Sequence, residues 1–176
     1  MISIFAAALG WIALPVSILR YQARTPIGVL LMSTLASFLF AGHYALIGAY
    51  SGAFLTLAGA ITSLLQVFAH GCLSTFVRVA IATPSILLAL YFSTINPLGI
   101  LAILAFAASR IAETWAREDH MRLSMVGAAL LWATYAASVG TIPVVLAEAI
   151  GLASAGFAYW RFSCAGKKSA GPAGSI

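Results

Sequence analysis

The stretch GVLLMSTLASFLFAGHYALIGAYSGAFLTLAGAITSLLQVFA, residues 28–69, contains no Lys, Arg, Asp or Glu. It consists of two apolar segments, 28–49 and 52–69, and the turn between them is also uncharged. A helix that crosses the hydrocarbon core of a bilayer needs roughly 20 mostly apolar residues. Because each segment has about that length, the stretch predicts a transmembrane helical hairpin.

The composition of the whole chain supports the same class. Of the 176 residues, 62% are hydrophobic and only 7% are charged, and the mean hydropathy is +1.05. Soluble globular domains contain about 25% charged residues, so these values exclude that class. Transmembrane β-strands alternate polar and apolar residues, whereas the segments of this chain are apolar on both faces. We therefore predict an all-α, polytopic membrane protein.

The apolar segments predict one domain that crosses the bilayer seven times. This domain spans residues 1–164, with helices at about 2–20, 28–49, 52–69, 78–94, 98–116, 123–140 and 142–162. Residues 165–176 are rich in Gly, Ala, Ser and Lys and have no apolar face to bury. Such a composition predicts a disordered tail.

The orientation of the chain follows from its Lys and Arg residues, which are retained on the cytoplasmic side during membrane insertion. All nine lie at or near the ends of odd-numbered segments, and the turns after even-numbered segments contain none. They are Arg20, Arg24, Arg78, Arg110, Arg117, Arg122, Arg161, Lys167 and Lys168. The N-terminus is therefore predicted outside and the C-terminus in the cytoplasm. The net charge of +5 can then bind anionic lipid head groups, and nucleic acid is not needed to explain it.

Part of the chain repeats internally. The second and third segments match the sixth and seventh when the sequence is shifted by 92 residues, so that Gly48 coincides with Gly140 and Gly59 with Gly151. A repeat of this kind predicts two parallel three-helix repeats joined by one linker helix, a 3+1+3 plan. The two repeats are then related by an axis along the membrane normal.

Three features of the sequence are shared with one known family. They are the run Leu39-Phe-Ala-Gly-His43-Tyr-Ala-Leu-Ile-Gly48-Ala-Tyr50-Ser-Gly-Ala53, a sixth segment that carries Trp132, and Glu148 in the seventh. In these features the chain resembles the YgjV family of bacterial inner-membrane proteins. The resemblance implies a location in the bacterial inner (plasma) membrane and no established substrate.

The 3+1+3 plan is similar in architecture to SWEET and PQ-loop transporters. The chain departs from the PQ-loop signature, because Pro15 is followed by Val16 rather than by Gln. A sugar-transport mechanism is therefore not carried over. Pro15 itself lacks a backbone N–H, which makes it a candidate hinge in the first helix.

Polar residues inside the apolar segments are the candidate functional groups, because a charged group at the bilayer centre costs at least about 2.5–3.5 kcal/mol. Glu148 lies about two turns into the seventh segment, with apolar neighbours on both sides. We predict that it binds a solute or a proton. The alternative is a structural hydrogen bond between helices.

Four more residues are assigned to the same predicted site: His43, Thr56, Gln66 and Tyr135. Thr56 coincides with Glu148 when the repeats are superimposed. Each of the four also has an ordinary structural role, because interfacial His and Tyr form aromatic belts. Thr and Gln commonly join membrane helices by hydrogen bonds.

Arg110 and Glu113 are three residues apart in the fifth segment, the spacing of an intrahelical ion pair. Arg110 lies near the cytoplasmic end, where a long side chain can reach the membrane surface. A structural role is therefore expected for this pair. The sequence contains no GxSxG, HExxH or phosphate-loop motif, so no catalytic residue, metal site or cofactor is predicted.

Two functions remain open at this point. The first is a small-solute transporter or facilitator with a polar site near the bilayer midplane, between the two three-helix repeats. The second is a non-transporting structural or regulatory membrane protein. In that case its Gly and Ala faces pack against a membrane partner or a second copy of the chain.

Overall fold

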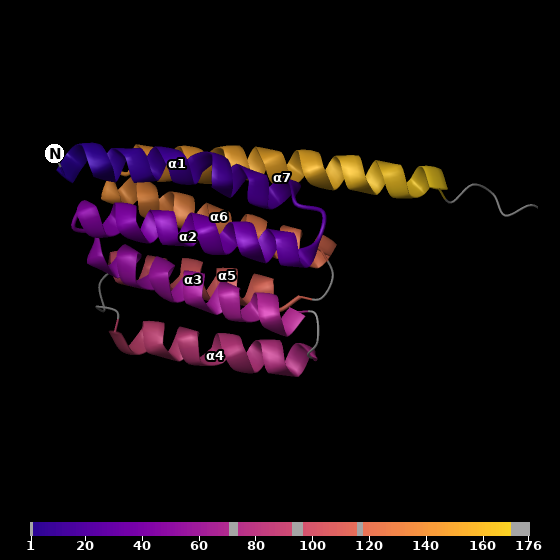
Figure 1. The fold of residues 1–176 in the computed structure, drawn as a ribbon, viewed down its shortest axis with the longest axis horizontal. Coiled ribbons are helices and arrows are strands. Elements are labelled where there is room, and N and C mark those ends of the chain that lie inside the picture. Colours follow the sequence, from indigo (N-terminus) through magenta and orange to yellow (C-terminus); the bar gives the residue numbers. More distant parts are fainter. Residues whose placement is uncertain (1, 71–73, 93–96, 116–117, 170–176) are drawn as a thin grey trace, which may run out of the picture.

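The computed structural model describes residues 2–70, 74–92, 97–115 and 118–169. Within these residues the chain is all-α and forms seven helices, which confirms the predicted all-α class and the number of helices (Figure 1). The helices are α1 (Ile2–Gln22), α2 (Pro26–Leu46), α3 (Tyr50–His70), α4 (Thr75–Phe92), α5 (Pro97–Glu113), α6 (Glu118–Val139) and α7 (Ile142–Ser169).

Six of the helices form a closed ring. α1 contacts α2 and α7, α3 contacts α2 and α5, and α6 contacts α5 and α7. α4 lies outside the ring against α3 and α5, at the edge of the bundle (Figure 1). The first and last helices of the chain are therefore neighbours, and the ring surrounds an interior to which distant parts of the sequence contribute.

The lengths and hydropathies of the helices suit a membrane. Among the described residues, three helical stretches are long and apolar enough to cross it: Ile4–Gln22, Pro26–Leu46 and Tyr50–Ala69. Three shorter apolar stretches are Thr75–Tyr91, Leu123–Val139 and Ile142–Phe157. The first three coincide closely with the first three predicted segments.

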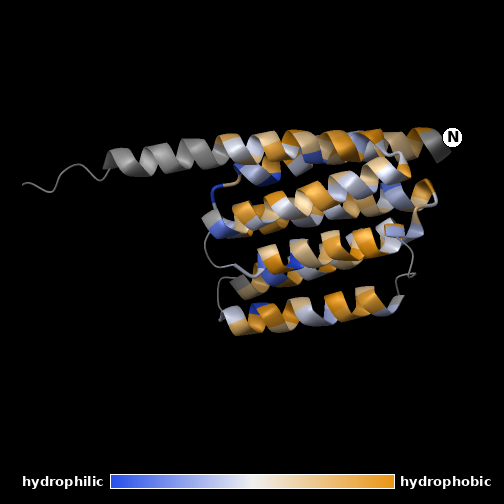
Figure 2. Cartoon of the chain, turned by 180° about the vertical axis from the view of Figure 1, so that it is seen from behind, coloured by the Kyte–Doolittle hydropathy of each residue, from blue (hydrophilic) through white to orange (hydrophobic). Residues whose placement is uncertain are grey.

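The outer surface of the bundle is apolar and part of its interior is polar. Every helix exposes large hydrophobic side chains. Hydrophobic residues predominate along the helices of the bundle (Figure 2). By contrast, Arg110, Glu113 and Glu148 are almost completely buried. An apolar surface of this extent requires an apolar solvent. The lipid bilayer supplies that solvent, and the buried charges must find partners inside the protein.

Two helices extend beyond their predicted limits. α6 begins at Glu118 rather than near residue 123, and α7 continues to Ser169 rather than ending near residue 162. Hydropathy marks only the part of a helix that lies in hydrocarbon, and a helix can continue into water because its backbone bonds are internal. Of the predicted tail, residues 165–169 thus belong to α7, and 170–176 lie outside the described residues.

The start of α2 is set by a local capping motif. Thr25 is the N-cap residue, and its hydroxyl accepts a hydrogen bond of 3.1 Å from the backbone N–H of Gly28. Pro26 follows at the first helical position, where a missing N–H costs nothing. α2 therefore begins two residues before the apolar segment predicted from hydropathy.

The α2–α3 and α6–α7 turns have the same geometry. Each contains a glycine in the left-handed region, Gly48 with φ 81° and Gly140 with φ 78°. In both turns the glycine N–H bonds the carbonyl three residues earlier at 3.2 Å. The next N–H bonds the carbonyl five residues earlier, at 2.9 Å in the first turn and 3.0 Å in the second. This pair of bonds is a Schellman motif, which favours glycine because side chains strain its backbone conformation.

Candidate functional site

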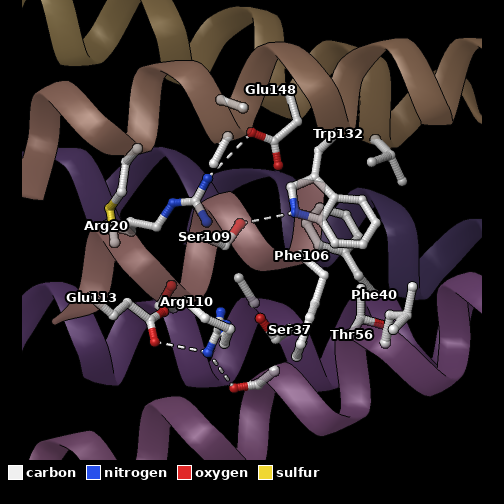
Figure 3. A pocket seen from close by; sticks show the side chains of 18 of the residues that line it. Arg20, Ser37, Phe40, Thr56, Phe106, Ser109, Arg110, Glu113, Trp132 and Glu148 are labelled. Carbon is white, nitrogen blue, oxygen red and sulfur yellow. Dashed lines mark hydrogen bonds and ion pairs between the residues drawn. The ribbon is translucent and has the colours of Figure 1, made fainter. Parts of the chain in front are cut away.

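A cavity of about 50 Å3 lies inside the six-helix ring (Figure 3). A water molecule needs roughly 10–15 Å3, so the cavity has room for more than one. All six ring helices contribute lining residues, and α4 contributes none. The charged lining residues are Arg20, Arg110, Glu113 and Glu148; the hydroxyl residues are Ser33, Ser37, Thr56 and Ser109; the aromatic residues are Phe40, Tyr44, Phe106 and Trp132.

Arg110 and Glu113 form a buried ion pair on one wall of the cavity, with 2.7 Å between Nη1 and Oε2. Arg110 Nη1 also donates to the carbonyl oxygen of Gly59 and to Oγ of Ser63 on α3, both at 2.8 Å. The Ser63 hydroxyl in turn donates to the Glu113 carboxylate, 2.8 and 3.0 Å from its two oxygens. This closed network joins α3 to α5 and neutralises both charges.

Arg20 and Glu148 form a second ion pair, between α1 and α7. Arg20 Nη2 lies 3.3 Å from Oε2 of Glu148 and donates to the hydroxyl of Tyr21 at 2.8 Å. Within the described residues, the contact with Arg20 is the only hydrogen bond of the Glu148 carboxylate. Its second oxygen points into the space beside Trp132 (Figure 3). This pair is longer and has fewer partners than the pair on α5, so it is the weaker of the two.

Aromatic rings separate the cavity from the bundle end that carries the α2–α3 and α6–α7 turns. Tyr44 and Trp132 line the cavity, and each makes an edge contact with Tyr135, with 5.8 Å between ring centroids. Tyr135 is also part of a surface depression beside Gly48 and Leu98. A thin aromatic layer therefore stands between the cavity and the surface at this end.

A comparison with known protein families identifies the family of this helical bundle. The model of the Imp-YgjV family, described as a bacterial inner membrane protein, matches residues 4–165. The chain belongs to the Imp-YgjV family of bacterial inner membrane proteins. The match confirms the family resemblance and the predicted membrane, and it agrees with the apolar outer surface of the helices. No curated protein and no solved structure matches the chain.

Of the five predicted site residues, two line the cavity of this Imp-YgjV protein: Glu148 and Thr56. Tyr135 lies in the aromatic layer beside it. His43 Nδ1 instead donates to a backbone carbonyl of α1 at 2.8 Å, and Gln66 Nε2 donates to a backbone carbonyl of α4 at 2.7 Å. His43 and Gln66 thus join neighbouring helices outside the cavity.

The roles expected for Arg110 and Pro15 can be compared with their positions. The ion pair of Arg110 with Glu113 is present, but the guanidinium does not reach the membrane surface and is only 4% exposed. Acceptors on α3 hold it in the interior. Pro15 lies within α1, which is one continuous helix from Ile2 to Gln22.

Sequence reasoning missed Arg20 as a site residue and assigned it to the cytoplasmic junction. α1 ends at Gln22, so Arg20 belongs to its last turn and reaches Glu148. Ser109 was also missed; its Oγ accepts a hydrogen bond of 3.0 Å from Trp132 Nε1. The helical spacing of Phe106, Ser109, Arg110 and Glu113 was a usable signal, because it places them on one face of α5.

What the cavity can bind depends on the side chains of the described residues. Among them, no three His, Cys, Asp or Glu side chains gather closely enough to hold a metal ion. The cavity instead offers two guanidinium groups, two carboxylates and several hydroxyls. These groups can bind a small polar solute by hydrogen bonds and charge.

The α1–α7 contact depends on close packing at Gly151. A Cβ atom at this position would lie 2.7 Å from Cε2 of Tyr21, which is 1% exposed. We expect Gly151→Ala to lower the free energy of unfolding by about 1–3 kcal/mol, because a packed interior must shift to admit a methyl group. Gly156→Ala is the matched control, since it lies on the same helix and a Cβ there meets nothing within 4 Å.

Unfolding of both variants can be followed by circular dichroism in detergent solution. We expect Gly156→Ala to be neutral or stabilising, since Ala favours helix over Gly by about 1 kcal/mol. Equal behaviour of the two variants would contradict the tight α1–α7 contact.

Proposed function

We propose that this protein is a small-solute transporter or facilitator of the bacterial inner membrane, and that the cavity inside the ring is its solute site. The proposal rests on one observation: polar and charged groups from all six ring helices line a common cavity inside the ring. Burying such groups in a membrane is costly, and proteins retain them where ions or solutes pass. The proposal includes no enzymatic step.

The proposed architecture is two three-helix repeats, α1–α3 and α5–α7, with α4 as the linker. In support, the set of neighbouring helices in the ring is unchanged when α1, α2 and α3 are exchanged for α5, α6 and α7. The glycine turns at Gly48 and Gly140 also match bond for bond. In this proposal seven helices cross the membrane, the N-terminus is outside and the C-terminus is in the cytoplasm.

The two repeats meet at two contacts, α3–α5 and α1–α7. At the α3–α5 contact, the network around Arg110 has bonds of 2.7–3.0 Å. At the α1–α7 contact, the ion pair spans 3.3 Å, and Gln22 Nε2 bonds the Ser154 hydroxyl at 2.6 Å. Pro15 remains the candidate hinge within α1.

Water access to the cavity tests this function. In a background with Cys72 and Cys164 replaced by Ser, we expect Ser37→Cys to react with a small, membrane-impermeant thiol reagent. Ser37 lines the cavity, and thiol reagents attack the thiolate, which requires a polar environment. Leu35→Cys, two residues away on α2, is the matched control because Leu35 is 47% exposed on the lipid-facing surface.

The labelling is measured in right-side-out and inside-out membrane vesicles. The expected result is modification of Ser37→Cys from at least one side, and none of Leu35→Cys. Failure of a folded Ser37→Cys variant to react from either side would overturn the proposal. The alternative function, a dry bundle that packs against a membrane partner, would then be favoured.

A further inference from the structure

We infer that the solute is a small zwitterion, a molecule of zero net charge that carries both an ammonium group and a carboxylate, as a small amino acid does. This inference rests on the proposed function, since it assigns the solute class of the same cavity. Three properties of the cavity lead to it: its charge balance, the atoms that remain open for bonding, and its size.

The cavity is electrically balanced. Its charged lining residues are two arginines and two glutamates, and each arginine is paired with a glutamate. A solute with a net charge would add an uncompensated charge to a site buried inside the bundle, which is expensive. A zwitterion adds none, so charge balance favours a solute with no net charge.

At the Arg20–Glu148 pair, the atoms that remain open for bonding are charged ones on neighbouring side chains. Arg110 and Glu113 already bond to each other and to α3, and Arg110 Nε is buried without a partner. At the second pair, one Glu148 oxygen and Arg20 Nη1 make no hydrogen bond within the described residues, and Arg20 Nε is buried without a partner. The Glu148 oxygen can accept from an ammonium group, and the Arg20 guanidinium can donate to a carboxylate.

A zwitterion can satisfy both of these groups together. Its ammonium and carboxylate would complete an alternating arrangement of four charges with Arg20 and Glu148. A neutral sugar or amide would also form charge-assisted hydrogen bonds with these two groups, but it lacks the attraction between opposite charges that an ammonium group and a carboxylate add. The open atoms therefore distinguish a zwitterion from other neutral solutes.

The size of the cavity restricts the solute further. Its volume of about 50 Å3 is well below the roughly 150 Å3 of a cavity that holds benzene. Phe40, Phe106 and Trp132 form bulky walls around it. We therefore expect glycine and alanine to bind before larger amino acids, with some widening of the ring as they enter.

Binding to the purified full-length protein in lipid nanodiscs tests the inference, with glycine, methylammonium and acetate as probes. Methylammonium and acetate each carry only one of the two charged groups. By isothermal titration calorimetry, we expect glycine to bind about tenfold or more tightly than either. Equal or tighter binding of methylammonium or acetate would overturn the inference, and so would the absence of glycine and alanine binding.

A change at Arg20 gives a second readout that loss of folding cannot imitate. In Arg20→Gln, Glu148 loses its positive partner, so we expect the preference to reverse from glycine to methylammonium. Arg24→Gln, at an exposed position between α1 and α2, is the matched control and should keep the preference for glycine. If Arg20→Gln does not fold, Arg20→Lys is tested instead, and it should still bind glycine more tightly than methylammonium. A folded variant at position 20 that violates its expected preference would contradict the inference.

Flux of labelled glycine into proteoliposomes separates the two proposals. Glycine binding without flux would overturn transport and leave the zwitterion site standing. Water access at Ser37→Cys without glycine or alanine binding would overturn the zwitterion inference and leave the solute pathway standing. The expected result is both binding and flux.

Discussion

Glu148→Gln is expected to reduce solute flux by about tenfold to a hundredfold. The amide is nearly the same size as the carboxylate, but it carries no charge for an ammonium group and leaves Arg20 without its counter-charge. A hydrogen bond to a charged group contributes about 1.5–3 kcal/mol, which corresponds to that range of rates. The measurement is counterflow of labelled glycine in proteoliposomes that contain equal amounts of folded protein.

The double variant Arg20→Gln, Glu148→Gln distinguishes a solute contact from a structural one. Removing both charges leaves no unpaired charge in the interior, so we expect the double variant to be about as stable as the wild type. Its flux should remain low, because both solute contacts are gone. Recovery of flux in the double variant would show that the pair only supports the fold.

Arg110→Met is expected to destabilise the protein by about 3–5 kcal/mol, the usual cost of leaving one member of a buried ion pair unpaired. The side chains of Arg110 and Glu113 are only 4% and 1% exposed, so both charges are shielded from bulk water. The change also removes the bonds from Arg110 to Gly59 and Ser63, which join α5 to α3. The free energy of unfolding can be measured by titration with a denaturing detergent.

The double variant Arg110→Met, Glu113→Gln is the control for this prediction. It removes both charges, and we expect it to recover most of the lost stability. If it is no more stable than Arg110→Met alone, the loss comes from packing or from the bonds to α3, and the ion pair is not its cause. Arg20→Gln should cost less than Arg110→Met, since the Arg20–Glu148 pair is longer and has fewer partners.

Much of the fold could be predicted from segments of the sequence. Apolar runs of about twenty residues indicate helices in hydrocarbon whatever their neighbours are, because lipid surrounds each of them alike. The glycines at 48 and 140 marked the two matching turns, since a left-handed backbone conformation favours glycine. The membrane and the family followed from the same local features. The side on which each terminus lies remains a prediction.

The ends of the helices were predicted less well. Thr25 and Pro26 start α2 through a cap that hydropathy does not register. α7 continues into the predicted tail as far as Ser169. In both cases backbone hydrogen bonding sets the end of the helix, whereas hydropathy marks only the boundary of the hydrocarbon.

The local pattern of this chain was sufficient for its class and its helices, and it made Glu148 a candidate, because each depends on residues adjacent in the sequence. The partner of Glu148 was not predictable in this way. Arg20 is 128 residues away, and its position at a basic junction indicated only the membrane surface. The two meet because the ring closes where α1 packs against α7. Which charges share the cavity is therefore a property of helix packing, since a buried charge takes the partner that packing brings within reach.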